Sequence, residues 1–291
     1  MQVICKYLFN AAILISIPVA LHGAEPPYFV TYSQQLEEPG ILEIEFSNVL
    51  GKPEGGNLFL GTAAELEYGL TGWWTTELYL DGQATGGDST IFTAFRWENR
   101  LRPLRREHWI NPVFYLEFED INGADKSPLE VVGHDSQGDL AEWNAQARGV
   151  KQREMEGKLL LSGNFKGWNV SENFILEKNL AGEPLEFGYA AGVSRAVRLA
   201  ARPEECVWCA ENFRVGLEFY GGLGTWKAFG LADTAHYAAP VISWELPSGV
   251  TLKVSPGFGL TGTSAPFLLR FGVSYEINQF GRALRGLGRE R

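Results

Sequence analysis

Residues 58–68 read LFLGTAAELEY, and this stretch alternates two kinds of side chain. One set of alternate positions holds Leu58, Leu60, Thr62, Ala64, Leu66 and Tyr68, and the other holds Phe59, Gly61, Ala63, Glu65 and Glu67. A period of two is the side-chain period of a β-strand, so the two sets lie on opposite faces. The stretch therefore predicts a strand with one apolar face and one face that carries small and acidic residues.

The same alternation recurs from residue 40 to residue 277, interrupted by Gly, Asn, Asp or Pro. It predicts about twelve strands: Ile41–Asn48, Leu58–Tyr68, Trp74–Asp81, Ile91–Arg100, Pro112–Asp120, Lys158–Phe165, Trp168–Lys178, Leu185–Arg195, Phe213–Gly221, Tyr237–Leu246, Val250–Gly259 and Phe267–Ile277. Most approach the roughly 9–11 residues that a tilted strand needs to cross a bilayer. Because consecutive strands have short links, the expected fold is all-β, a transmembrane up-and-down antiparallel β-barrel.

Residues 1–24 have the organisation of a secretory signal peptide. Lys6 supplies a positive charge, Leu8–Leu21 is apolar, and small residues precede Glu25. An uncleaved membrane anchor is the alternative, although the segment is short and has the wrong flanks for one. We therefore expect a mature chain that begins at Glu25 and is exported to the bacterial outer membrane.

Three features indicate that the apolar faces point outward into lipid. The chain has an export signal, its polar faces mix Gly and Ala with Glu, Arg and Tyr, and aromatic residues gather near the predicted strand ends. A charge that faced lipid near mid-membrane would cost about 2–4 kcal/mol, so the charged faces have to point inward. The lumen-facing candidates are Glu43, Glu45, Glu65, Glu67, Glu117, Glu119, Arg214, Glu218, Arg270 and Glu276.

Several of these carboxylates are paired two residues apart, as Glu65 and Glu67 are. Such a pair lies on one face of a strand and could act as acid and base in a glycosidase. Arginines such as Arg214 and Arg270 share the lumen face, which favours a network of ion pairs that fills and stiffens the barrel. The functional alternative is a weakly cation-favouring pore or a lumen that binds a solute.

The links alternate in length, as they do in outer-membrane barrels, where periplasmic turns are short and outer loops are longer. Tight turns are expected at residues 69–72, 166–167 and 247–249, and a long polar loop at residues 122–157. Residues 101–106, LRPLRR, form a basic cluster in a periplasmic link, which is either a solvated turn or a contact with anionic lipid headgroups or peptidoglycan. The expected organisation is a periplasmic lead-in (25–39), the barrel (40–277) and a basic C-terminal tail (278–291).

The bulk composition excludes two broad classes. The 291 residues have a formal net charge of −10 and show no extended basic stripe before the tail, which argues against nucleic-acid binding. The mean hydropathy of −0.10 argues against a helical membrane protein. A barrel is compatible with this value, because its polar lumen offsets the lipid-facing residues.

Residues that carry chemistry are few. Cys206 and Cys209 form a lone CxxC pair, which is a poor zinc site, and a disulfide or two free thiols is expected in an exported protein. His134 lies near Asp135 and Asp139 but without the spacing of a calcium-binding EF-hand. The GxSxG motif of a serine nucleophile is absent from the sequence. We therefore expect no catalytic residue, no metal site and no cofactor.

The second half of the chain carries stretches with a family resemblance. They are Trp168–Lys178, Leu185–Val193, Gly216–Gly224, His236–Val241 and Leu269–Glu276. Together they resemble the bacterial outer-membrane β-barrel family labelled as phenol meta-pathway degradation proteins or transporters. The resemblance implies a barrel fold, an outer-membrane location and a role near aromatic degradation, and it implies no site residues.

These observations leave three functional hypotheses. The first is a passive channel or binder for a small solute, hydrophobic or aromatic if the family label applies. The second is a non-conducting structural or adhesive barrel that makes contacts through residues 122–157. The third is a membrane-embedded hydrolase that would use His236. The expected partners are outer-membrane lipid and a small solute, with no nucleic acid.

Overall fold

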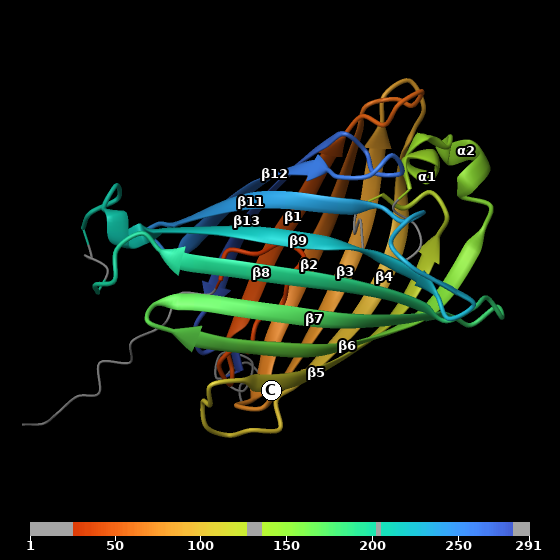
Figure 1. Ribbon diagram of the computed structural model, residues 1–291. Helices are drawn as coiled ribbons and strands as arrows, with labels where there is room; N and C mark the ends of the chain where they lie inside the picture. Colours follow the sequence, from red (N-terminus) through yellow and green to blue (C-terminus); the bar gives the residue numbers. More distant parts are fainter. Residues whose placement is uncertain (1–25, 127–135, 202–204, 282–291) are drawn as a thin grey trace, which may run out of the picture.

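The computed structural model describes residues 26–126, 136–201 and 205–281, which form a tilted β-barrel (Figure 1). The expected signal peptide, residues 282–291 of the basic tail, and His134 lie outside the described residues. The long strands are β1 (Leu42–Gly51), β2 (Phe59–Thr71), β3 (Trp74–Thr85), β4 (Thr90–Leu101), β5 (Asn111–Asn122), β6 (Lys151–Phe165), β7 (Trp168–Asn179), β8 (Glu186–Ala196), β9 (Phe213–Thr225), β11 (His236–Glu245), β12 (Val250–Gly259) and β13 (Phe267–Ile277).

The barrel is closed and antiparallel throughout the described strands. Strands adjacent in sequence pair in order, β13 pairs with β1, and the pairing of β8 with β9 completes the circle. β10 (Ala228–Phe229) is a two-residue strand that pairs only with the end of β9. The prediction of an up-and-down barrel of about twelve strands is confirmed.

The largest difference between a predicted and an observed strand boundary is at the start of β6, while β3 and β9 each extend four residues beyond their predicted ends. β6 begins at Lys151, whereas the alternation predicts a start at Lys158. Residues 151–157 read KQREMEG. Lys151 and Arg153 are exposed on the outer face, at positions where the other strands have apolar residues. Backbone pairing with β5 extends the strand although the side chains show no apolar alternation.

The apolar face points outward. On β5, Phe114 and Leu116 are 53% and 52% exposed, whereas Tyr115 and Glu117 between and beside them are 3% and 0% exposed. Exposed large apolar side chains occur on every long strand except β8, and most of the residues at the alternate positions are buried. A wall that is apolar outside and charged inside is that of a transmembrane barrel.

The two ends of the barrel differ. The turns between β2 and β3, β6 and β7, and β11 and β12 are short, and Gly281 donates its backbone N–H to Gly40 at the same end. The links between β4 and β5 and between β8 and β9 are longer, and the second contains the short helix η1 (Ala210–Asn212). We call this end the short-turn end and the opposite one the loop end.

The longest loop folds against the loop end of the barrel and contains α1 (Gln137–Ala141) and α2 (Asn144–Ala147) (Figure 1). Leu140 packs in the main apolar cluster, and the backbone N–H of Asn144 donates to Asp88 at 2.7 Å. Lys126 Nζ donates to the carbonyl of Glu142 at 3.1 Å, and burial lowers the pKa of this ammonium below its usual value. Within the described residues, no helix is long and apolar enough to cross a membrane.

Residues 26–39 lie inside the barrel. The sequence predicts them as a periplasmic lead-in, but Tyr28, Val30 and Thr31 are buried and contact wall residues of β7 and β9. The reason is physical: backbone without a strand partner needs hydrogen bonds, and the polar lumen wall supplies them. The lumen is therefore filled by this N-terminal segment as well as by the side chains of the wall.

Candidate functional site: an acidic lumen filled by the N-terminal segment

A continuous row of glutamates crosses nine neighbouring strands. In the order β13, β1 and then β2 to β8, directly paired residues are Glu276, Glu43, Glu67, Glu77, Glu98, Glu117, Glu156, Glu177 and Glu186. Directly opposed residues of paired strands have Cβ atoms about 4.5–5.5 Å apart, and like charges at that spacing repel. We call this set the glutamate row.

The glutamate row extends along the barrel from one end to the other. Glu276 is the last but one residue of β13, at the short-turn end, and it is exposed. Glu186 is the first residue of β8, at the loop end, and it is half-buried. The seven glutamates between them are all buried. The tilt of the strands turns a row of paired residues into an acidic path along the inner wall.

Basic side chains from β4, β6 and β12 partly neutralise this wall. Arg100 Nη2 binds Glu67 and Glu77, and Arg100 Nε lies 3.1 Å from Glu98. Lys158 Nζ lies 2.7 Å from Glu156.

Two further basic residues bind carboxylates in the row or beside it. Arg96 Nε lies 2.7 Å from Asp81 and its Nη1 lies 3.1 Å from Glu117. Lys253 Nζ lies 2.7 Å from Glu45. Charges buried this deeply persist only when they are paired.

Glu218 of β9 holds the N-terminal segment. The backbone N–H groups of Val30 and Thr31 donate to its Oε1 at 2.9 and 2.8 Å, and that of Phe29 donates to its Oε2 at 3.1 Å. The carboxylate is 0% exposed. Three charge-assisted hydrogen bonds to consecutive backbone groups fix the course of the segment at this point.

Tyr32 is the second anchor of the segment. Asn173 of β7 accepts from the Tyr32 N–H at 2.6 Å and donates to its carbonyl at 2.9 Å. The Tyr32 hydroxyl donates to Glu98 at 3.1 Å, and Tyr79 donates to the same carboxylate oxygen at 2.9 Å. The ring also lies under the ammonium of Lys158, 4.8 Å from its centroid. The N-terminal segment is thus joined to the glutamate row itself.

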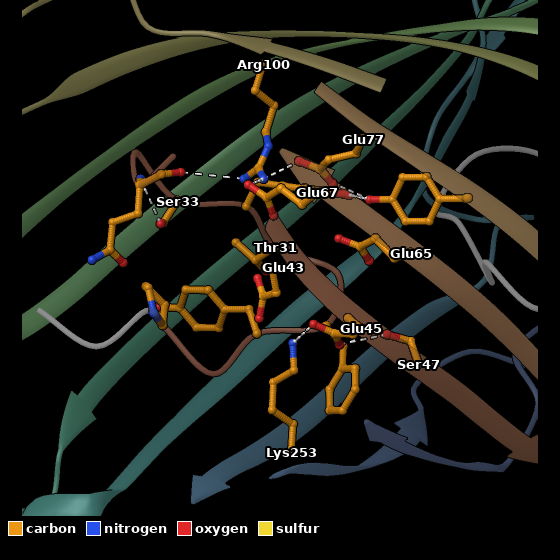
Figure 2. A pocket seen from close by; sticks show the side chains of 16 residues that line it. Thr31, Ser33, Glu43, Glu45, Ser47, Glu65, Glu67, Glu77, Arg100 and Lys253 are labelled. Atoms are coloured by element: carbon orange, nitrogen blue, oxygen red, sulfur yellow. Dashed lines mark hydrogen bonds and ion pairs between the residues drawn. The ribbon is translucent and has the colours of Figure 1, made fainter. Parts of the chain in front are cut away.

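A cavity of about 110 Å³ remains between the segment and the wall (Figure 2). Its walls carry five carboxylates, from Glu43, Glu45, Glu65, Glu67 and Glu77, and two basic groups, from Arg100 and Lys253. Figure 2 shows Arg100 and Lys253 on opposite sides of the carboxylates. The cavity is therefore small, polar and acidic.

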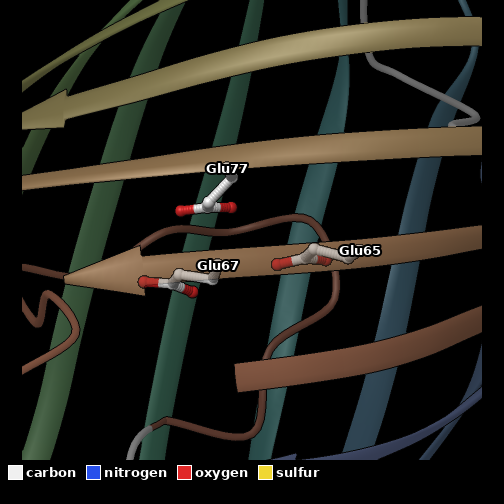
Figure 3. A group of neighbouring side chains, drawn as sticks. All are labelled: Glu65, Glu67 and Glu77. Atoms are coloured by element: carbon white, nitrogen blue, oxygen red, sulfur yellow. The ribbon is translucent and has the colours of Figure 1, made fainter. Parts of the chain in front are cut away.

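Two groups of carboxylates have the spacing that a metal ion would need. The oxygens of Glu65, Glu67 and Glu77 lie within 4.8 Å of one another (Figure 3), as do those of Glu117, Glu119 and Glu156. Oxygen ligands at this spacing suit Ca²⁺ or Mg²⁺. Each group already contacts a basic side chain, Arg100 in the first and Lys158 in the second, so an ion-pair network accounts for both.

The structure places the lumen candidates of the sequence as follows. Glu43, Glu45, Glu67, Glu117, Glu119, Glu218 and Arg270 are buried, Glu65 and Arg214 are half-buried, and Glu276 is exposed at the barrel end. Arg270 lies over the ring of Tyr220, with 5.6 Å between the guanidinium carbon and the ring centroid. The sequence reasoning missed Arg96, Arg100 and Lys158, although Arg96 and Arg100 share the face of Glu98 on a predicted strand.

The cysteine and histidine candidates lie away from the lumen cavity. Cys206 and Cys209 form a disulfide in the link between β8 and β9. His108 lies in the link between β4 and β5 and is exposed. The ring of His236 contacts the hydroxyls of Tyr189 at 3.1 Å and Thr234 at 2.9 Å, and Ser264 Oγ binds its backbone. These contacts tie strand ends and loops together at the loop end.

Comparisons with known proteins support the fold and go no further. No protein-family model matches the chain, and no curated protein matches its sequence. The phenol meta-pathway label implied by the resemblance therefore stays a prediction.

Several solved structures share the barrel. An outer membrane channel from Pseudomonas putida is 12% identical with a TM-score of 0.53, over 86% of this chain and 100% of that one. The KdgM porin is 8% identical with a TM-score of 0.49, over 80% and 98%. The translocator domain of the autotransporter NalP from Neisseria meningitidis is 12% identical with a TM-score of 0.45, over 82% and 89%. At 12% identity, the likeness to the Pseudomonas putida channel concerns the fold alone, that of a barrel of the outer-membrane type.

Proposed function

We propose that the protein is an outer-membrane channel that favours small cations, and that its N-terminal segment closes the lumen until it is displaced. The observation that carries the proposal is the glutamate row, which joins one barrel end to the other along the inner wall. Rings and rows of carboxylates select cations in pores.

The N-terminal segment supports the second half of the proposal. It crosses the lumen, and it is held by hydrogen bonds, aromatic contacts and the apolar packing of Val30 and Phe29. None of these is strand pairing, so the segment can leave without opening the barrel wall. Segments that lack a large apolar core are drawn from the low-stability part of a structure. The wall, in contrast, is a closed ladder of twelve strands.

Planar-bilayer recording tests the proposal. We expect the mature chain to give rare openings with a reversal potential that favours cations in a KCl gradient. Glu218→Ala removes the acceptor for three backbone N–H groups of the segment, so open probability should rise by about 100-fold or more, since each hydrogen bond to a charged group contributes about 1.5–3 kcal/mol.

The matched control is Glu211→Ala. Glu211 is also a glutamate, but its ion pair with Arg198 lies in the link between β8 and β9 and contacts no residue of the N-terminal segment in the described structure. Its open probability should equal that of the wild type. Anion preference in the open state, or equal open probabilities in the Glu218 and Glu211 variants, would contradict the proposal.

The proposal also names a class of solute. The cavity beside the segment is lined by carboxylates and two basic groups, which favours a small polar cation as its occupant. The aromatic solute implied by the family resemblance stays a separate prediction. A competition experiment separates them, because block of the current by an organic cation supports the first and block by a neutral aromatic compound supports the second.

A non-conducting structural barrel is the second candidate. The specific observation in its favour is that the cavity between the segment and the wall has a volume of about 110 Å³. The same recording decides, because this candidate predicts no openings in either variant.

A further inference from the structure

A groove of about 1030 Å³ runs along the outer wall over β3 to β6. Its sides are formed by Trp74, Phe95, Trp97, Leu101, Leu116 and Met155, all outward-facing or at the wall surface. Register places Gly157 of β6 opposite Leu116, so the wall has no side chain at that point. The groove is therefore a depression in the lipid-facing surface, and Gly157 lies at its β6 side, next to the lining residues Met155 and Leu116.

The indole groups of the groove are fixed in place. Trp74 Nε1 donates to Asn99 Oδ1 at 3.0 Å, and Trp97 Nε1 donates to Thr76 Oγ1 at 3.0 Å. With these donors satisfied by the wall, the rings present only apolar surface to an occupant. The shape of the groove is thus set before anything binds.

The groove begins at the short-turn end, where a basic cluster lies. Leu101 lines the groove, and Arg102 follows it directly and donates its backbone N–H to the Trp73 carbonyl at 2.9 Å and its Nη2 to the Gly72 carbonyl at 2.8 Å. Exposed Arg105 and Arg106 come next in the same link.

The length of the groove matches one acyl chain. From the register position of Leu101 to that of Phe95 is six residues of β4, or about 20 Å at about 3.3 Å per residue. One leaflet of a bilayer core is about 15 Å deep. The occupant that fits both the apolar groove and the arginines at its end is a lipid of the same leaflet with a negatively charged headgroup.

We propose that this groove binds an anionic glycerophospholipid, with an acyl chain beside Trp97 and Gly157 and the headgroup phosphate at Arg102, Arg105 and Arg106. The site is on the outside of the wall and is independent of conduction through the lumen. On this proposal the basic link between β4 and β5 binds a lipid headgroup and is not simply a solvated turn.

Fluorescence quenching by brominated lipids tests the proposal. The full mature chain is placed in phosphatidylcholine bilayers that contain either brominated phosphatidylglycerol or brominated phosphatidylcholine, and the part of the quenching lost in Trp97→Phe reports on the groove. Each basic side chain near anionic lipid strengthens binding by about fivefold, so we expect phosphatidylglycerol to be preferred by about tenfold or more.

Two variants separate the parts of the site. Replacing Arg102, Arg105 and Arg106 together by Gln should abolish the preference for phosphatidylglycerol and leave the quenching by phosphatidylcholine unchanged. Gly157→Leu should lower the quenching of Trp97 by both lipids, because it fills the groove. A Cβ at Gly157 meets only the Tyr115 carbonyl oxygen, at 3.9 Å, so the variant has room to fold.

The matched control is Ala191→Leu on β8, an apolar enlargement at a half-buried wall position that β7 separates from the groove. Retained heat-modifiable migration shows that each variant is folded. Equal quenching by the two lipids in the wild type, or no effect of Gly157→Leu, overturns the proposal. So does a dimer in detergent that Gly157→Leu dissociates, because the groove would then bind a second copy of the chain.

Discussion

At the scale of single residues, Glu218 is the wall side chain that accepts three backbone hydrogen bonds from the N-terminal segment. Glu218→Gln removes the negative charge and leaves one acceptor oxygen for three backbone N–H donors, so we expect the segment to open about 30-fold more often, a loss of about 2 kcal/mol. Hydrogen exchange of a peptide that contains Phe29, Val30 and Thr31 measures this change.

Glu276→Gln is the control for that experiment, because Glu276 is exposed at the end of β13. It should leave exchange in residues 26–39 unchanged. Unchanged exchange in Glu218→Gln as well would mean that the segment is held by other contacts.

Arg100 is the basic residue that contacts the largest number of buried carboxylates in the ion pairs described above. It contacts Glu67, Glu77 and Glu98, and all four side chains are buried. Arg100→Met should lower the free energy of unfolding by about 3–5 kcal/mol, because it leaves buried carboxylates without their counter-charge. Urea titration followed by the heat-modifiable gel shift measures the loss.

Arg153→Met provides the comparison for Arg100. Its ion pair with Asp120 spans 3.3 Å but is exposed, and exposed pairs contribute about 0–1 kcal/mol. If both variants lowered stability equally, the buried network would have no special role in holding the barrel together.

At the scale of elements, the link between β8 and β9 carries an aromatic stack beside its disulfide. The rings of Trp208 and Trp244 are stacked with centroids 4.2 Å apart, and Trp244 Nε1 donates to the Val207 carbonyl at 2.9 Å. Cys206 and Cys209 enclose both Val207 and Trp208. The disulfide therefore holds the link in the conformation that makes the stack.

Replacing both cysteines by Ser should weaken this stack and spare the barrel. We expect a reduced near-UV circular dichroism signal from the coupled indoles, with an unchanged urea midpoint because the strand ladder is intact. A lowered midpoint with an unchanged near-UV signal would show that the disulfide stabilises the wall instead of the link.

The strands themselves could be predicted from the sequence, because each alternates over a length that crosses a bilayer. Predicted Trp168–Lys178 and Phe267–Ile277, for example, became Trp168–Asn179 and Phe267–Ile277. Residues 151–157 were not predicted as strand because Lys151 and Arg153 occupy the first two outer positions and Gly157 the last. The helices α1 and α2 were not predicted because helices of five and four residues leave no periodic signal.

The site was harder to predict than the wall. The parity of each strand assigned Glu43, Glu67 and Glu117 to one face, but the glutamate row exists only once the register of neighbouring strands is known. The position of residues 26–39 inside the barrel could not be predicted from the sequence. An extended segment has no period, and its partners Asn173 and Glu218 lie on strands far along the chain.

In the molecule as a whole, the two faces of the wall have opposite chemistry: apolar side chains face lipid, and charged ones face the lumen. Leu66 and Glu65 are neighbours on β2 with opposite directions, since Leu66 is 44% exposed on the outside and Glu65 lines the lumen cavity. A soluble barrel with the same strands would reverse both directions.

The most direct measurement uses a nitroxide label on a cysteine at either position in bilayers. Cys206 and Cys209 are joined in the disulfide and do not compete for the label. The account predicts that the label in Leu66→Cys meets oxygen dissolved in lipid far more often than an aqueous nickel complex, whereas the label in Glu65→Cys shows no such excess. A label at Leu66 that is shielded from oxygen, with one at Glu65 freely reached by the nickel complex, would contradict it.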